Sequence, residues 1–344
     1  MATEGDITAD LGNHVEVRTF SESSLPLVVR PASDEYRSLD ALLDWGRDHF
    51  DALDRALVAH GAVLLRGFEV PDTAAFERVS DLFPPYELGY QGGATARAKI
   101  AGRVYEATHV PSEVWIMLHQ EMAYMRTFPS KLAFYCHVSP VEGGETTIGD
   151  MRTFTAALPT RLLDDLAHRG VRYQRNFISP DTIDGRTNPV FNHMNWVEAF
   201  YTDDPRQVEA DCAERGLEYE WQPDGSITTW NVLPGVAVHP IAGDTVYFSQ
   251  LHTQRPHPRR MGNDAWSAYS QVYREGAHHP YNACFGDGTP LAEEDMMAIY
   301  VALDDVTVSF RWQHGDVMFV DNLHTGHGRN PYVGHRDVQV ALIA

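Results

Sequence analysis

The chain has 344 residues, a hydrophobic fraction of 43% and a formal net charge of -21. This composition can supply a packed core and excludes a wholly disordered chain. The negative charge repels phosphate backbones and anionic lipid surfaces, so we expect neither nucleic acid nor a membrane as a partner. Any anionic ligand must therefore be bound by local arginines.

The 3 cysteines are odd in number and show no paired spacing. This pattern points to reduced thiols in a cytoplasmic protein rather than to a disulfide framework. The N-terminus carries acidic residues without the apolar segment of a signal peptide, and no apolar run elsewhere reaches membrane-spanning length. We expect a soluble cytoplasmic protein, whose oligomeric state the sequence leaves open.

Near the N-terminus, apolar side chains recur at helical spacing over residues 39–57, and Gly61 is a candidate C-terminal cap. We expect one packed helix here, followed by a short apolar strand at 62–68. Asp72 then caps a second predicted helix that runs to Phe83.

Residues 84–111 are rich in Gly, Pro and Tyr and have little periodicity, which predicts long loops around a site. Short strands dominate the rest of the chain, interrupted by a few helices and by an irregular loop at 178–195. Strands are predicted at 115–121, 131–138, 145–148, 171–177, 218–222, 236–239, 245–251, 306–312, 317–325 and 338–343, and helices at 161–168, 204–215 and 291–303.

Many short strands with long excursions favour a mostly β protein with peripheral helices, built on a double-stranded β-helix (a cupin-like jelly roll). We expect a single domain over residues 1–344. It comprises an N-terminal extension of approximately 1–30, a helical and loop region at 35–112 packed on the jelly roll, and a core at 113–344 with inserted helices and loops. No glycine-rich phosphate loop joins a strand to a helix, which argues against a nucleotide-binding fold.

His119 and Glu121 are two residues apart, a spacing that places both side chains on one face of a strand. They can therefore share one metal ion. Two imidazoles and one carboxylate leave three positions of an octahedral ferrous ion open, so a distal histidine is required. Because the chain has 17 histidines, the pair alone is weak evidence. His324 and His327 compete for the distal position, and their offset of three would turn them to opposite faces of a continuous strand.

Three motifs in this order resemble the taurine dioxygenase-like (TauD/TfdA) superfamily. They are His119-Gln120-Glu121, Gly143-Gly144-Glu145-Thr146-Thr147, and His327-Gly328-Arg329-Asn330-Pro331-Tyr332-Val333-Gly334-His335-Arg336. From residue 61 to the C-terminus the chain is most similar to the syringomycin-biosynthesis-like branch. The resemblance implies a dioxygenase that uses Fe(II), O2 and 2-oxoglutarate as cosubstrate, with release of succinate and CO2.

The resemblance also implies roles for individual residues. It selects His327 over His324, because the family's distal ligand precedes Gly-Arg, so that the metal ligands would be His119, Glu121 and His327. Arg336 fits the arginine that binds 2-oxoglutarate, and Thr146 stands where a threonine contacts the same molecule. An arginine fork suits a carboxylate, to which a threonine hydroxyl adds a hydrogen bond. The Gly143-Gly144 pair is read as backbone geometry. Other nearby side chains receive no role, since they could equally fill a core or clamp a loop: Arg97, Tyr124, Trp196, His252 and Arg329.

Related halogenases replace the carboxylate ligand with a small residue, whereas Glu121 is retained here. Hydroxylation of a C–H bond is therefore the preferred reaction, with desaturation, epoxidation or cyclisation as alternatives on the same iron centre. The branch implies an amino acid or amino-acid-derived substrate, free or tethered to a carrier protein, in specialised-metabolite biosynthesis. Two other classes stay open: a zinc-dependent hydrolase with the same ligand types, which has no use for Arg336 and Thr146, and a non-catalytic jelly-roll binding module.

Overall fold

The computed structural model describes residues 9–20, 25–90, 98–107, 110–181, 193–274 and 279–344. The chain divides into two compact units. The first contains 1–157, 237–248 and 302–344, and the second contains 158–236 and 249–301, so the second is inserted twice into the sequence of the first. That the whole chain folds as one domain stays a prediction.

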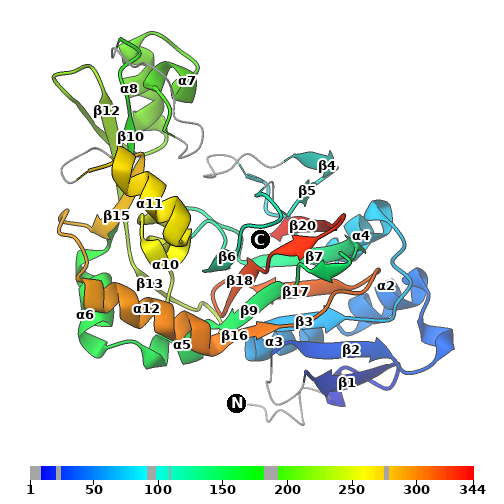
Figure 1. Ribbon diagram of the computed structural model, residues 1–344. Coiled ribbons are helices and arrows are strands. Elements are labelled where there is room, and N and C mark those ends of the chain that lie inside the picture. Colours follow the sequence, from blue (N-terminus) through cyan, green and yellow to red (C-terminus); the bar gives the residue numbers. More distant parts are fainter. Residues whose placement is uncertain (1–8, 21–24, 91–97, 108–109, 182–192, 275–278) are drawn as a thin grey trace. The chain divides into compact units, whose positions relative to one another are not determined.

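The first unit contains an eight-stranded sheet in the order β1-β2-β3-β17-β7-β20-β5-β4 and a four-stranded sheet in the order β16-β9-β18-β6 (Figure 1). Strands β2 and β3 are parallel, and all other neighbours in these two sheets are antiparallel. Two short pairs, β13-β14 and β19-β8, complete its strands. The bounds are β1 Val15–Thr19, β2 Leu27–Pro31, β3 Ala62–Leu65, β4 Lys99–Ala101, β5 Val104–Glu106, β6 Ile116–His119, β7 Lys131–Val138, β8 Glu142–Gly143, β9 Thr146–Asp150, β13 Val236–Val238, β14 Thr245–Tyr247, β16 Thr307–Ser309, β17 Val317–Asp321, β18 Thr325–Arg329, β19 Tyr332–Val333 and β20 Asp337–Ile343.

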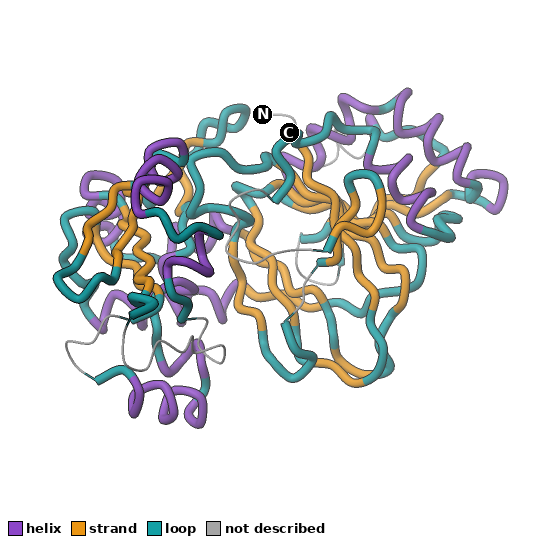
Figure 2. Tube along the Cα trace, turned by 90° about the horizontal axis from the view of Figure 1, so that it is seen from above, coloured by secondary structure: helices purple, strands orange, loops and turns teal. Residues whose placement is uncertain are grey.

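Most helices of the first unit come from its N-terminal part. Their bounds are η1 Asp34–Tyr36, α2 Leu39–Asp48, α3 Phe50–His60, α4 Thr73–Ser80 and α5 Met151–Ala157. Figure 2 distinguishes the helices (purple) from the strands (orange) of the chain. Among the described residues, no helix is both long and apolar enough to cross a membrane.

Inner strands of the eight-stranded sheet alternate between two cores, because neighbouring residues of a strand point to opposite faces. Val63 and Leu65 of β3 belong to a core shared with α2, α3 and α4. Ala62 and Leu64 belong to a second core that includes Ile148 of β9. Helices therefore cover one face of the large sheet and the small sheet covers the other. This confirms the mostly β jelly roll with peripheral helices.

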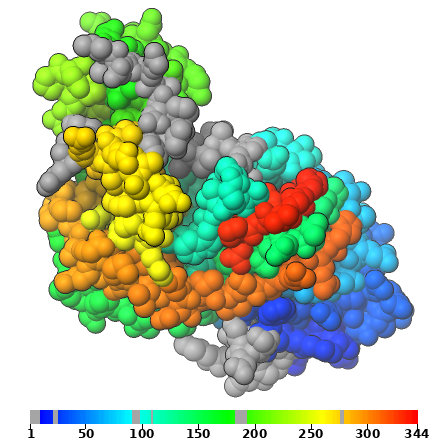
Figure 3. Space-filling view, in the orientation of Figure 1, coloured from blue at the N-terminus to red at the C-terminus, as the bar shows by residue number. Residues whose placement is uncertain are grey.

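The last strand of the chain lies inside the large sheet rather than at its edge. Strand β20 pairs with β7 on one side and β5 on the other, and Figure 3 shows the red C-terminal strand beside the green of β7. The main chain of β20 thus has hydrogen-bonding partners on both sides, as a buried strand requires.

A buried salt bridge joins the end of β3 to the turn before β17. The Arg66 guanidinium donates through Nε to Asp316 Oδ1 at 3.0 Å and through Nη2 to Oδ2 at 2.6 Å. The two side chains are only 7% and 1% exposed. A buried ion pair needs such two-point geometry to offset the cost of removing both charges from water.

The second unit contains a four-stranded sheet in the order β11-β12-β10-β15. The strands of this sheet are β10 Val171–Phe177, β11 Glu218–Trp221, β12 Ile227–Leu233 and β15 Tyr281–Phe285. The helices of the unit are α6 Thr160–Arg169, α7 Trp196–Phe200, α8 Pro205–Glu214, α9 Leu251–Gln254, α10 Pro258–Met261, α11 Asn263–Val272 and α12 Glu293–Val306. Helix α12 continues into the first unit. A local core contains Trp196, Phe200, Val208, Cys212 and Ile227.

Some local predictions were wrong. The single helix expected over 39–57 is two helices that meet at His49, whose φ of -114° and ψ of 22° end the first one. Gly61 does cap the second, with a φ of 77°. Residues 84–111 include β4 and β5, which are short and pair at an edge, so no apolar alternation marked them. The N-terminal extension of approximately 1–30 stays a prediction, and β1 and most of β2 fall within its bounds. Most of the 178–195 loop lies outside the described residues.

Candidate metal centre

Two histidines from distant parts of the chain face each other across a strand pair. Strand β18 runs antiparallel to β6, and the register places His327 directly opposite His119. Opposite residues of antiparallel strands project to the same face, and here the ring centroids are 4.4 Å apart. The ring of Phe134, on β7 of the large sheet, lies 5.1 Å from that of His327. The histidine pair therefore faces the interior of the jelly roll.

Glu121 follows the end of β6 and lies beside the two histidines. Its side chain is buried, and its Oε2 atom lies 3.4 Å from His327 Nε2. One nitrogen from each histidine and one carboxylate oxygen all lie within 4.8 Å of one another. The structure thus brings together the three residues that the sequence motifs single out.

A hydrogen bond to the backbone fixes the orientation of the His119 ring. Its Nδ1 lies 3.0 Å from the carbonyl oxygen of Met117, so this nitrogen carries the proton and Nε2 presents its lone pair. A backbone carbonyl that orients a ligating imidazole in this way is a common feature of metal sites. Two imidazoles and one carboxylate in this arrangement fit a divalent iron ion with open positions.

His324, the competing distal ligand, belongs to a different cluster. It lies in the turn before β18 rather than on the strand, and its Nδ1 donates to the carbonyl oxygen of Val58 at 2.9 Å. Its ring stacks on His239 with centroids 4.0 Å apart, and its Nε2 is 3.1 Å from Asp244. His324 lies in the turn and His327 lies on β18. The two side chains therefore differ in surroundings for this reason, and not because they point to opposite faces of one continuous strand.

His239, Asp321 and His324 also bring their side-chain atoms within 4.8 Å of one another. The His239 Nδ1 atom accepts hydrogen bonds from the backbone N–H groups of Ile241 and Ala242. Its proton must therefore sit on Nε2, which donates to Asp321 at 3.0 Å. Neither ring nitrogen of His239 is left to bind a cation, so this cluster is a structural hydrogen-bond network. No local motif around His239 could have revealed it from the sequence.

Thr146 and Arg336 meet beside the histidine pair. Thr146 opens β9 and lies two residues before Ile148, which is opposite His327 on β18. Thr146 therefore projects from the same face of the small sheet as His327. The Arg336 guanidinium donates through Nε to the carbonyl oxygen of Gly144 at 2.9 Å and through Nη2 to Thr146 Oγ1 at 3.4 Å.

Arg336 is a half-buried cation. Among the residues that the structure describes, it forms no salt bridge. Burial, with a smaller contribution from the nearby charge of Arg329, lowers the pKa of Arg336 to about 10. The guanidinium is therefore charged at neutral pH, and an anionic ligand would relieve its unfavourable position. A carboxylate matches its fork of N–H donors.

Trp312 is a residue of this site that the sequence reasoning missed. Its buried indole Nε1 donates to Thr146 Oγ1 at 3.0 Å. Because the Thr146 oxygen accepts from both Trp312 and Arg336, its own proton is available to a further acceptor. A carboxylate oxygen placed there would receive that proton in a hydrogen bond. A tryptophan outside any motif gave no signal of this function.

The glycine pair before Thr146 has the geometric role that we predicted. Gly143 and Gly144 have φ values of 68° and 70°, a region that residues with a Cβ rarely adopt. A Cβ on Gly144 would lie 2.6 Å from Cγ of Pro140 and 3.1 Å from Cδ of Arg336. The glycines thus allow the main chain to approach the arginine closely enough for Gly144 to accept its hydrogen bond.

The side chains that received no role lie in several places. Arg329 donates to the carbonyl oxygens of Val110, Pro111 and Val114, so it clamps a backbone segment. Trp196 and His252 are buried in the second unit. Arg97 lies outside the described residues.

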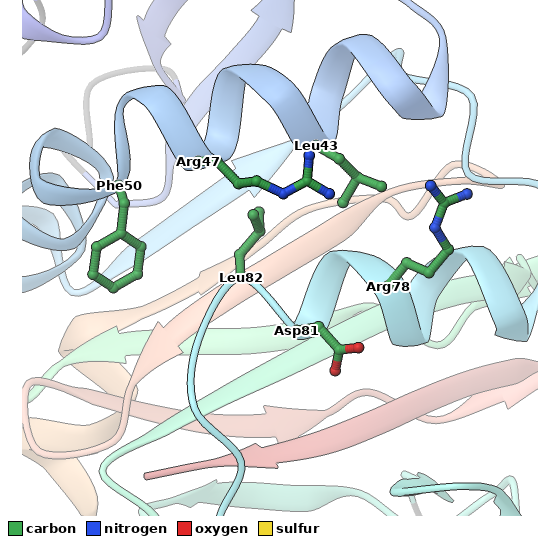
Figure 4. A pocket seen from close by; sticks show the side chains of 6 residues that line it. All are labelled: Leu43, Arg47, Phe50, Arg78, Asp81 and Leu82. Atoms are coloured by element: carbon green, nitrogen blue, oxygen red, sulfur yellow. The ribbon is translucent and has the colours of Figure 1, made fainter.

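A separate surface pocket of about 390 Å³ lies between α2 and α4 (Figure 4). Its charged residues are already paired: Arg47 with Asp44, Arg78 with Asp40, and Asp81 with Arg103. These surface ion pairs satisfy the local charges, so the pocket offers no competing site for an anion or a metal. Its lining is Leu43, Arg47, Phe50, Arg78, Asp81 and Leu82.

The chain is similar to known proteins along most of its length. The model of the family described as "Taurine catabolism dioxygenase TauD, TfdA family" matches residues 25–342. The dapdiamide synthesis protein DdaC of Enterobacter agglomerans is 32% identical over 308 residues, which cover 88% of each chain. A clavaminate synthase-like protein of Arabidopsis thaliana is 32% identical over 294 residues, covering 84% of this chain and 83% of the relative.

Among solved structures, PvcB of Pseudomonas aeruginosa has the same fold, with a TM-score of 0.53 at 15% identity over 96% of this chain and 92% of PvcB. PvcB is described as an Fe, alpha-ketoglutarate dependent oxygenase. None of these similarities tests the syringomycin-biosynthesis-like branch, which stays a prediction. The family match spans almost the entire chain. The chain therefore belongs to the TauD/TfdA family of dioxygenases, non-haem iron enzymes that use Fe(II), O2 and 2-oxoglutarate.

Proposed function

We propose that this enzyme hydroxylates an unactivated C–H bond of an amino acid or an amino-acid-derived small molecule, with release of succinate and CO2. The observation that carries the proposal is the Glu121 carboxylate, which lies 3.4 Å from His327 Nε2 in the interior of the jelly roll. With a carboxylate at this position, a halide has no vacated place beside the metal. Hydroxylation is therefore favoured over halogenation, and desaturation, epoxidation or cyclisation would use the same residues.

The proposed roles follow from the geometry of the side chains. Iron(II) would be held by Nε2 of His119, Nε2 of His327 and the carboxylate of Glu121. Arg336 and Thr146 would bind a carboxylate of 2-oxoglutarate, with Trp312 and Gly144 holding these two side chains in place. When bound, the metal with 2-oxoglutarate and O2 supplies an oxidant that can remove hydrogen from carbon. The chain itself provides orientation, a pre-formed anion site and a buried location that limits access of water.

The substrate class rests on resemblance and on the names of relatives. DdaC is named for dapdiamide synthesis, and PvcB is assigned to an isonitrile synthetic pathway. Both names support a small molecule in a biosynthetic pathway. We propose an amino acid or its derivative, either free or tethered to a carrier protein, as in the branch that the sequence resembles. We also propose a cytoplasmic location, which the three buried, unpaired cysteines support.

The first test is anaerobic addition of Fe(II) and 2-oxoglutarate to metal-free protein. A weak visible charge-transfer band is expected, because a chelated oxoacid and a ferrous ion share one site. A zinc-dependent hydrolase would give no such band, and the protein as isolated, before metal removal, would contain zinc. The second test measures succinate across a panel of free and carrier-tethered amino acids. A non-catalytic binding module would bind one of them tightly and produce no substrate-stimulated succinate.

A Glu121→Ala variant should lose hydroxylation and bind Fe(II) more weakly. The matched control is Glu142→Ala, which removes an exposed carboxylate at the start of β8 and should have no effect. Full hydroxylation by the Glu121→Ala variant would remove Glu121 from the site. Halogenation by that variant in the presence of chloride would support its place beside the metal.

A further inference from the structure

Asn322 is buried in the turn between β17 and β18, and its side chain forms two hydrogen bonds with the backbone of Glu121. It is 0% exposed. Its Oδ1 accepts a hydrogen bond from the Glu121 backbone N–H at 2.7 Å, and its Nδ2 donates to the Glu121 carbonyl oxygen at 3.0 Å. The same Nδ2 donates to the carbonyl oxygen of Pro129 at 2.8 Å. Both sides of the amide are thus committed to backbone groups, two of which belong to the candidate carboxylate ligand.

The backbone that Asn322 holds has an unfavourable conformation. Met122, the residue after Glu121, has a φ of 56° although it is not a glycine, and its side chain is buried. A residue with a Cβ adopts this left-handed region at a cost and keeps it only where the surroundings enforce it. Gln120 adds to this enforcement, because its Nε2 donates to the carbonyl oxygens of Tyr247 and Leu323, each at 2.9 Å.

The turn that presents Asn322 is itself well anchored. Asp321 Oδ1 accepts from the backbone N–H groups of Leu323 and His324, each at 3.0 Å. The backbone N–H of Asn322 donates to the carbonyl oxygen of Ser130 at 2.9 Å. The chain then enters β18 and reaches His327 five residues after Asn322. The short segment 322–327 therefore supplies the candidate ligand His327 and also hydrogen-bonds to the backbone of the candidate ligand Glu121.

We propose that Asn322 is a positioning residue that sets the direction of the Glu121 carboxylate relative to His327, and so sets the affinity of the site for a divalent metal. The inference rests on the proposed metal site and concerns its assembly. An asparagine suits the task because one planar group offers an acceptor and two N–H donors. Aspartate has the same shape but lacks those donors, and it would add a buried negative charge beside two carbonyl oxygens.

The test compares Asn322→Asp with wild type by titration with Mn(II), followed by electron paramagnetic resonance of free and bound metal. Loss of a residue that orients a metal ligand weakens binding by about 10- to 100-fold, and we expect a rise in Kd of that size. The spectrum of bound Mn(II) should also change, because the carboxylate would no longer approach from one fixed direction. A purely structural residue would lower the melting temperature without changing this spectrum.

The matched control is Asn176→Asp in the second unit. Asn176 is a buried asparagine whose Nδ2 donates to the carbonyl oxygen of His279 and whose Oδ1 accepts from Thr228. Its substitution should lower stability and leave Mn(II) affinity unchanged. Equal weakening of Mn(II) binding by both substitutions would overturn the proposal, as would wild-type affinity and spectrum in Asn322→Asp.

A measurement on the wild type keeps the proposal testable if Asn322→Asp does not fold. In metal-free protein, the backbone amide of Glu121 should exchange its hydrogen as slowly as amides of β7, because Asn322 holds it before any metal arrives. Fast exchange would overturn the proposal. Failure of the wild type to bind Mn(II) or Fe(II) would overturn the proposed function together with this inference. Normal metal binding by both wild type and Asn322→Asp would overturn only the role of Asn322.

Discussion

Two arginines with opposite surroundings, the buried Arg66 and the half-buried Arg336, allow a sharp test of the proposed oxoacid site. Arg66 forms a two-point salt bridge with Asp316. Arg336 donates only to uncharged oxygens of Gly144 and Thr146 within the described structure. We expect Arg336→Met to abolish 2-oxoglutarate binding while leaving the ligand-free protein at least as stable as wild type. Arg66→Met should destabilise the ligand-free protein and leave 2-oxoglutarate binding intact.

The expected magnitudes follow from the two environments. The lowering of the pKa of Arg336 to about 10 means that folding disfavours its charged form by about 3 kcal/mol. The two hydrogen bonds of Arg336 each stabilise the folded state by about 1 kcal/mol and so offset part of this penalty. Arg336→Met should therefore raise the free energy of unfolding by between about 0 and 2 kcal/mol. The penalty on the charge is fully present below about pH 10, so an assay at neutral pH measures all of it. Arg66→Met leaves Asp316 buried and unpaired, which should cost about 3–5 kcal/mol.

The assay is urea unfolding of metal-free protein, repeated with Mn(II) and 2-oxoglutarate. A ligand at 100 times its Kd stabilises the folded state by about 2.7 kcal/mol, so wild type should show a clear shift that depends on 2-oxoglutarate. Arg336→Met should show none, and Arg66→Met should retain it. A loss of more than about 2 kcal/mol by ligand-free Arg336→Met, together with an intact 2-oxoglutarate shift, would refute the reasoning.

Three further outcomes test the surroundings of the site. Trp312→Phe removes the N–H donor to Thr146, so calorimetry should show a rise of about 2- to 10-fold in the Kd of 2-oxoglutarate, and an unchanged Kd would contradict the role of Trp312. Gly144→Ala places a Cβ 3.1 Å from Arg336 Cδ at a φ of 70°, so denaturant unfolding should show a loss of about 1–3 kcal/mol. Burial alone would raise the pKa of Asp321, but hydrogen bonds from His239 and the His324 backbone lower it below 3.8. The contribution of Asp321 to stability is therefore complete above about pH 4 and is lost as pH falls through the folded-state pKa, so the stability of Asp321→Asn should depend less on pH below 4 than that of wild type.

Much of the architecture could be predicted from the sequence because the local signals agree with the fold. The strands β7 and β10 were predicted with their observed bounds, since each is a run of strand-forming residues with clear ends. Asp72 and Gly61 mark the helix ends that they were expected to mark. The strands β4 and β5, and the helices between Leu251 and Val272, were missed. Their conformation depends on neighbours that local periodicity does not report.

At the candidate site, too, local motifs identified some residues and gave no sign of others. Motif order alone singled out His119, Glu121, His327, Thr146 and Arg336. These residues can be recognised because each has a fixed place in a short local pattern. The residues that hold them were not predicted: Trp312 and Asn322 belong to no motif, and their partners are 166 and 201 positions away in the chain.

The sequence by itself indicated the family, the proposed ligand types and the retained Glu121, because these depend on which residues occur and in what order. The resemblance selected His327 over His324, and the tertiary structure supplies the physical reason, since strand pairing places His327 opposite His119 and leaves His324 in the preceding turn. The tertiary structure also showed that Arg336 is a half-buried cation beside Thr146. Burial and charge pairing are properties of packed neighbours, and no spacing of residues along a chain reports them.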